Sequence, residues 1–201
     1  VLHSSFDRAD AALARIAAEY DRPASAVDER SIHTHLLASA PAGQVVEAKG
    51  DLEQGRRLAA ALVEATYLTP YVAHAPLEPH TALAEVRPDG ATVWASTQTP
   101  FGAQAEVAQA LGLPKEKVRI ITPFVGGGFG GKTRNRQVVE AARLARLAGR
   151  PVQVAWSRAE EFFLDTFQPA AVVTIRAGLD AAHRLVLWDY VVYFAGERAS
   201  Q

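Results

Sequence analysis

The segment from 126 to 131 reads Gly-Gly-Gly-Phe-Gly-Gly, so five of its six residues are glycine. A tight turn needs far fewer glycines, and this density indicates that another group approaches the backbone closely. Without Cβ atoms the loop can expose successive amide N–H groups, and the helix expected after it adds a partial positive end. The loop therefore predicts binding of phosphate or another oxygen-rich anion, with a tightly packed turn as the structural alternative.

Lys132 and Thr133 complete the letters of a nucleotide phosphate-binding loop, GxxxxGKT, that begins at Gly126. In that interpretation Lys132 reaches phosphates and Thr133 binds magnesium. The apolar run 185–188 ends at Asp189, where a magnesium-site carboxylate would stand. Any apolar strand that enters a turn offers such a residue, so a nucleotide hydrolase is one alternative function.

Two features count against the nucleotide interpretation. Pro123 interrupts the strand just before the loop, where a nucleotide-binding core would continue its hydrogen bonding. Residues 134–136 read Arg-Asn-Arg, yet they stand where the following helix should begin to bury an apolar face. The apolar stripe starts only at Val138.

The composition is that of an ordinary globular chain, with 49% hydrophobic residues among 201 and a net charge of −1. This charge gives no electrostatic reason to expect nucleic-acid binding. The chain has no cysteine, which excludes disulfides and a cysteine-bound iron–sulfur cluster within it. No apolar run reaches the ~18 residues of a membrane span. Because methionine is absent and the sequence opens on Val1, we expect a fragment of a longer protein.

Periodicity and turn residues predict an α+β fold, a mixed sheet with helices. Helices are expected over residues 9–20, 52–61, 100–112 and 137–147. Strands are expected over residues 81–87, 91–96, 117–121, 152–156, 170–176 and 185–194.

Proline and glycine divide these elements. Three prolines within 63–84 disfavour helix there, so that stretch should be extended or looping. Pro88-Asp89-Gly90 should close a hairpin, and a turn at 178–180 should join the last two strands as an antiparallel pair. Residues 1–44 are expected to be an N-terminal helix and a polar linker, with Pro23 ending the helix, and to form the tail of a preceding domain. Residues 45–201 should form a second, partial domain.

Three motifs occur in a fixed order along the second domain. They are Tyr-Val-Ala-His-Ala-Pro-Leu-Glu-Pro at 71–79, Ser-Thr-Gln-Thr-Pro at 96–100, and the glycine loop with Lys132. Together they resemble the xanthine dehydrogenase and aldehyde oxidase family of molybdenum hydroxylases. The motif at 71–79 is most similar to the bacterial carbon monoxide dehydrogenase and isoquinoline 1-oxidoreductase types, and the resemblance runs from about residue 45 to the end of the chain.

This resemblance implies that residues 45–201 are part of a molybdopterin-binding domain in the large subunit of such an enzyme. The implied cofactor is molybdopterin, with the cytosine dinucleotide form as one option, and the implied reaction hydroxylates an aldehyde or N-heterocycle with oxygen from water. The implied partners are the rest of the molybdopterin subunit, an iron–sulfur subunit or domain, and a small organic substrate. No nucleic acid and no membrane span is expected, and the compartment is left open between cytoplasm and periplasm.

By motif position, Gln98 corresponds to the family's glutamine whose amide hydrogen-bonds an oxo ligand of molybdenum. Its structural alternative is a strand-end glutamine bonded to backbone. The residues expected to contact the cofactor are Gly127, Gly128, Phe129, Gly130 and Gly131. Phe129 and Gly130 match the aromatic residue and glycine that border the metal ligands, although Phe129 alone would also suit a core anchor.

The chain departs from the family pattern at Thr133, where several relatives carry a glutamate that touches substrate. This substitution argues against purine-type recognition. The family's general-base glutamate lies beyond Gln201, so the fragment is expected to be inactive by itself, and it should supply no ligand to the metal. A structural or assembly domain without catalytic function is the second alternative.

Several polar residues remain as weaker candidates. His33 and His35 could share a strand face as metal ligands, or lie in a solvated linker. Pro76 forbids a helix that would join His74 and Glu78, so these two should shape the pocket wall. Arg134 and Arg136 stand where they could contact anionic parts of the cofactor, or form a solvated face.

Overall fold

The computed structural model describes residues 1–21 and 27–195, and its larger sheet has the strand order β5-β4-β3-β6. Strands β3 (Thr81–Arg87) and β4 (Gly90–Ala95) form the predicted antiparallel hairpin. Strand β5 (Val118–Ile121) runs parallel to β4, whereas β6 (Val152–Ala155) runs antiparallel to β3. The predicted α+β class with a mixed sheet is confirmed.

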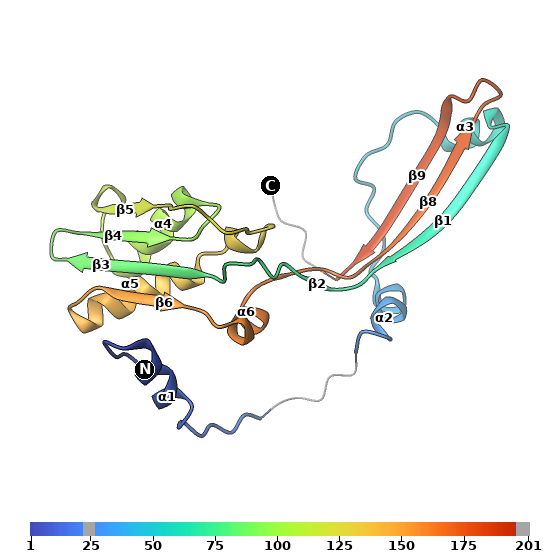
Figure 1. The fold of residues 1–201 in the computed structure, drawn as a ribbon. Coiled ribbons are helices and arrows are strands. Elements are labelled where there is room, and N and C mark those ends of the chain that lie inside the picture. Colours follow the sequence, from blue (N-terminus) through green and yellow to red (C-terminus); the bar gives the residue numbers. More distant parts are fainter. Residues whose placement is uncertain (22–26, 196–201) are drawn as a thin grey trace.

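Two helices cover this sheet and complete its core. Helix α4 (Pro100–Leu111) packs on β5, and α5 (Arg136–Ala148) packs on α4, β3 and β6 (Figure 1). The core cluster is mostly alanine and valine, including the fully buried Ala84, Val93 and Ala142. Because these side chains are short, the helices approach the sheet closely and the interior stays densely packed. A short 3-10 turn, η1 (Lys115–Lys117), leads into β5.

A second sheet extends away from the first as a long arm (Figure 1). It contains β1 (Ala61–Thr69), β8 (Ala171–Leu179) and β9 (Leu185–Phe194) in the order β1-β8-β9, with every pair antiparallel. Helix α3 (Leu52–Leu58), capped by the Asp51 carboxylate, packs on β8 and β9. Much of the arm's apolar surface is exposed, including Leu62, Tyr67, Leu68, Trp188 and Val191.

A short strand pair and a short helix lie where the arm joins the larger sheet. Strands β2 (Val72–Ala73) and β7 (Phe167–Gln168) pair antiparallel there (Figure 1). Helix α6 (Arg158–Leu164) begins at a capping box made by Ser157 and Glu160. No element was predicted at this helix, and its C-terminal end delivers Asp165 towards β2.

The predictions for the N-terminal residues were partly wrong. Helix α1 (Phe6–Leu13) starts earlier and ends sooner than the expected 9–20, and none of its residues is buried. Helix α2 (Ile32–Ser39) occupies part of the predicted linker, because Ile32 is buried and α2 packs on β8 and β9. Pro23 lies outside the described residues, and the domain division at residue 45 stays a prediction.

The described residues include no helix with both the length and the apolar character that a bilayer crossing requires.

Candidate functional site

The glycine loop crosses one end of the larger sheet, where four segments distant in sequence meet. The loop follows β5 and ends in a 3-10 turn, η2 (Gly131–Thr133), rather than running directly into α5. The segment after β2 supplies His74 and Glu78, and the segment between β4 and α4 supplies Gln98. Helix α6 ends below the loop at Asp165. The three sequence motifs therefore form one site.

Glu78 and Lys132 hold the two ends of the loop together. The Glu78 carboxylate accepts the Gly126 N–H at 2.5 Å, and the Glu78 N–H donates to the Gly126 carbonyl at 3.2 Å. The other oxygen of the same carboxylate accepts from Lys132 Nζ at 3.2 Å. Lys132 is fully buried, whereas the Glu78 side chain keeps 30% of its surface exposed. One carboxylate thus fixes the start of the loop and compensates the buried ammonium after it.

The surroundings of Glu78 favour its ionised form. Burial alone raises the pKa of Glu78, but the nearby Ser96 hydroxyl, the Gly126 N–H and the Lys132 ammonium together lower it below its ordinary value. The Ser96 hydroxyl makes no hydrogen bond of regular geometry among the described residues, so the firm contacts are those to Gly126 and Lys132.

We predict that the Glu78–Lys132 pair stabilises the chain at neutral pH and loses this contribution in acid. A lowered folded-state pKa means that the unfolded chain takes up the proton first, so stability falls as the pH drops below about 4.5, the ordinary value. Unfolding free energies of the wild type and Glu78→Gln, measured between pH 7 and pH 3, should converge towards acid. A difference that stays constant over this range would contradict the assignment.

Gln98 is held so that its amide nitrogen remains available. Its Oε1 accepts the Gly130 N–H at 3.1 Å, and its backbone N–H donates to the Lys132 carbonyl at 2.9 Å. Since the carbonyl oxygen faces the loop, the NH2 group points elsewhere, and no partner for it occurs within residues 1–21 and 27–195. A Cβ at Gly128 would overlap the Gln98 amide, so this glycine makes room for it.

The middle of the loop leaves backbone donors open. Among the described residues, the N–H groups of Gly127, Gly128 and Phe129 have no hydrogen-bond partner. Phe129 has a φ of +54° and is 73% exposed, which excludes the alternative interpretation of this residue as a core anchor. A non-glycine residue in left-handed backbone is uncommon, and here it directs an aromatic ring outwards beside the free amides. Open amides, a freed side-chain NH2 and an exposed ring fit an oxygen-rich organic anion.

A buried network lies beneath the loop. His74 Nδ1 lies 3.1 Å from Asp165 Oδ2, and His80 Nδ1 lies 3.3 Å from Glu161 Oε1. His80, Glu161 and Asp165 are close enough to hold a metal ion. However, the Arg158 guanidinium lies 3.8 Å from the same Glu161 oxygen, and a second positive charge there would be repelled. That His74 and Glu78 shape the wall of a cofactor pocket stays a prediction.

Sequence reasoning missed His80, Glu161 and Asp165. The spacing of Ser157 and Glu160 would have located α6, because a serine followed three residues later by glutamate is a helix-start signature. Asp165, which directly follows the last residue of this helix, would then have been a candidate.

The features required by a nucleotide site are not assembled. Lys132 is turned inwards to Glu78, and the Thr133 hydroxyl donates to the Gly130 carbonyl at 2.6 Å. Asp189 lies on β9 in the arm, 3.7 Å from Arg176. The geometry therefore gives no support to a phosphate-binding loop with a magnesium site.

The remaining polar candidates have other surroundings. His33 and His35 lie on helix α2, neither on a strand nor in a linker, and the His33 ring contacts the Thr69 carbonyl at 3.0 Å. Arg136 donates to the Leu164 carbonyl at 2.9 Å and so ties α5 to α6, while Arg134 is exposed.

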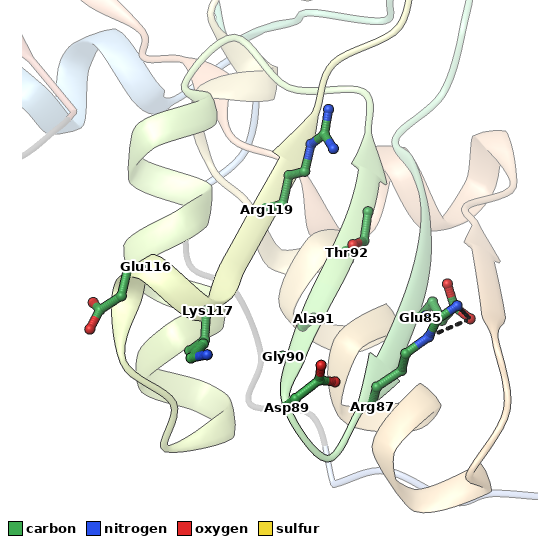
Figure 2. Close-up of a pocket in the computed structure, with 9 residues that line it drawn as sticks. All are labelled: Glu85, Arg87, Asp89, Gly90, Ala91, Thr92, Glu116, Lys117 and Arg119. Carbon is green, nitrogen blue, oxygen red and sulfur yellow. Dashed lines mark hydrogen bonds and ion pairs between the residues drawn. The ribbon is translucent and has the colours of Figure 1, made fainter.

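A shallow polar pocket lies at the other end of the larger sheet, around the β3–β4 turn (Figure 2). Its walls mix both charge signs, with Asp89 and Glu116 beside Lys117 and Arg119. The Glu85–Arg87 ion pair on its rim spans 2.8 Å. Because β4 runs away from this turn towards Gln98, the pocket is separate from the glycine loop.

Comparison with known proteins places these motifs in one family. The sequence profile of the molybdopterin cofactor-binding domain matches residues 36–196. The aldehyde oxidoreductase molybdenum-binding subunit PaoC of Escherichia coli K12 is 33% identical over 189 residues, covering 92% of this chain and 25% of PaoC. Isoquinoline 1-oxidoreductase subunit beta of Brevundimonas diminuta is 35% identical over 109 residues, covering 54% of this chain and 14% of that subunit.

Structural similarity agrees with the sequence matches. Quinoline 2-oxidoreductase from Pseudomonas putida 86 superposes with a TM-score of 0.72 at 25% identity, over 94% of this chain and 25% of that one. The chain thus spans about a quarter of the length of PaoC and of the quinoline enzyme.

Proposed function

Because this chain belongs to the molybdopterin cofactor-binding domain family, we propose that it forms one wall of a molybdopterin site in a larger oxidoreductase subunit. The proposed enzyme hydroxylates an aldehyde or N-heterocycle with oxygen taken from water. The observation that carries this proposal is the paired arrangement of the glycine loop and Gln98. Within residues 1–21 and 27–195, three loop amides have no hydrogen-bond partner, while the Gly130 N–H orients the Gln98 amide with its NH2 outwards.

The bound cofactor would supply the two-electron redox chemistry, and the chain's own residues would hold and polarise it. The amides of Gly127, Gly128 and Phe129 would donate hydrogen bonds to its oxygens. The Gln98 NH2 would donate to an oxygen that carries negative charge, which a neutral donor can do without adding a charge. The Phe129 ring would exclude water from one side of the reacting group.

The proposal assigns the general base and the remaining cofactor contacts to sequence outside this chain. We further propose an iron–sulfur subunit or domain as electron acceptor, since the chain's lack of cysteine leaves that cluster to a partner. We propose the cytosine dinucleotide form of the cofactor. The rest of the subunit would cover the exposed apolar side chains of the β1-β8-β9 arm, such as Leu62, Tyr67 and Trp188.

Metal and pterin analysis tests the proposed function directly. The larger subunit containing this chain, purified from a host that makes molybdopterin, should carry molybdenum and pterin in equimolar amounts. Metal content would be measured by mass spectrometry and pterin by the fluorescence of its oxidised form. A subunit that is folded by circular dichroism but lacks both would overturn the proposal.

A further inference from the structure

The His74 ring lies directly against the glycine loop. A Cβ at Gly131 would come within 2.9 Å of His74 Nδ1 and 2.5 Å of Asp165 Oδ2. A Cβ at Gly130 would lie 3.6 Å from His74 Nε2. The ring therefore spans both glycines, with Nδ1 on the inner side and Nε2 beside Gly130.

Asp165 sets the orientation of this ring. Its carboxylate is only 5% exposed, and it accepts the Thr166 N–H at 2.7 Å through the oxygen that does not face His74. An ionised carboxylate only accepts hydrogen bonds, so the contact at 3.1 Å requires the proton on His74 Nδ1. The tautomer is thereby fixed, as it is for histidines that a neighbouring carboxylate holds in place.

The other ring nitrogen is left for a partner outside this chain. His74 Nε2 has no hydrogen-bond partner within the described parts of the chain. It is also not one of the fully buried polar atoms that lack a partner there. The side chain keeps 15% of its surface exposed. Next to it, Gly130 donates its N–H to Gln98 Oε1, so the His74 ring and the Gln98 amide lie beside the same glycine.

We propose that His74, oriented by Asp165, contacts the bound cofactor through Nε2 and helps position it on the loop. This inference rests on the proposed function. In a neutral ring with the proton on Nδ1, Nε2 is a hydrogen-bond acceptor, so the expected ligand group is an N–H or O–H donor of the cofactor beside Gly130. The competing interpretation is that His74 only packs against Asp165 to support the loop, with Nε2 facing water.

Chemical modification tests the contact in the unaltered protein. Diethyl pyrocarbonate acylates accessible imidazole nitrogens, and mass spectrometry locates the product. In the larger subunit we expect His74 to react when the cofactor is absent and to be protected when it is bound. The exposed His35, on α2, serves as the internal control and should react equally in both forms. Equal reactivity of His74 in the two forms would overturn the inference.

Two substitutions separate a cofactor contact from a supporting role. Asparagine places its amide nitrogen near the Nδ1 position, so His74→Asn can keep the bond to Asp165 but loses the outer nitrogen. His74→Gln reaches the Nε2 position, where its amide oxygen can accept the same hydrogen bond. We expect His74→Asn to accelerate molybdenum loss on dialysis about tenfold, the effect of one lost hydrogen bond to a polar or charged group. His74→Gln should stay near the wild-type rate.

The inference requires faster molybdenum loss from His74→Asn than from His74→Gln, and equal rates for the two variants would contradict it. Retention by His74→Asn with loss by His74→Gln would establish the supporting role and overturn the inference. Circular dichroism of the cofactor-free variants reports on folding, and if either variant is unfolded, the modification experiment on the wild type decides alone. Absence of molybdenum from the wild-type subunit is a different result, because it rejects the proposed function itself.

Discussion

Replacing Glu78 with alanine is expected to destabilise the folded chain by about 3 kcal/mol, since breaking a buried ion pair from one side leaves the other charge uncompensated. The charge left behind is the ammonium of Lys132, which has no exposed surface. The Gly126 N–H loses its acceptor in the same substitution. We expect the lower end of the usual 3–5 kcal/mol range because Glu78 is partly exposed, so water can enter the space that it vacates. Chemical denaturation followed by circular dichroism would measure the change.

The companion substitution Lys132→Met provides the matched test. Methionine fills the buried volume without a charge and so removes the uncompensated ammonium, which means that Glu78→Ala/Lys132→Met should be more stable than Glu78→Ala alone. Glu85→Ala is the surface control, because it breaks the exposed pair with Arg87 at the opposite end of the sheet and should change stability little. If adding Lys132→Met to Glu78→Ala lowers stability further, the buried-charge explanation is wrong.

The core fold could be predicted because its signals are local. The turn at 88–90, Pro100 at the first helical position and the left-handed Gly112 and Gly149 mark their elements without tertiary information. At the N-terminus the same reasoning failed. Helix α2 is stabilised by the burial of Ile32 against the arm, and the sequence of the helix itself does not predict that contact.

The part of the site that depends on the backbone of the glycine loop could be predicted from the sequence. The side-chain pairs between residues distant in sequence could not. Five glycines in six residues indicate that another group approaches the backbone closely, whatever the fold. The order of the three motifs along the sequence also indicated which segments accompany the loop. The partners of His74 and His80 come from a helix about 80 to 90 residues further along the chain, at sequence separations of 91 and 81. An aspartate or glutamate so far along the chain has no sequence feature that identifies it as the partner of a particular histidine. The partner of Lys132 was missed for the same reason, since Glu78 lies 54 residues before it.

Gln98→Ala in the cofactor-loaded subunit should lower turnover on the order of 100-fold while folding is preserved, which is the effect of removing one oriented donor from a site of developing negative charge. The side chain is exposed at the edge of the sheet and buries little apolar surface, so its loss should change the unfolding free energy little. Turnover of an aromatic aldehyde or N-heterocycle at saturating substrate measures the effect.

Gln98→Glu is the informative control because it separates the two ends of the amide. Glutamate retains an oxygen that can accept the Gly130 N–H, so the loop contact at 3.1 Å is preserved. It lacks the NH2 donor, and it adds a negative charge where the site needs a donor. If Gln98 serves only to brace the loop, the glutamate variant should work nearly as well as the wild type. If the outward NH2 acts on the cofactor, the glutamate variant should be at least as impaired as alanine, with the same cofactor content as the wild type.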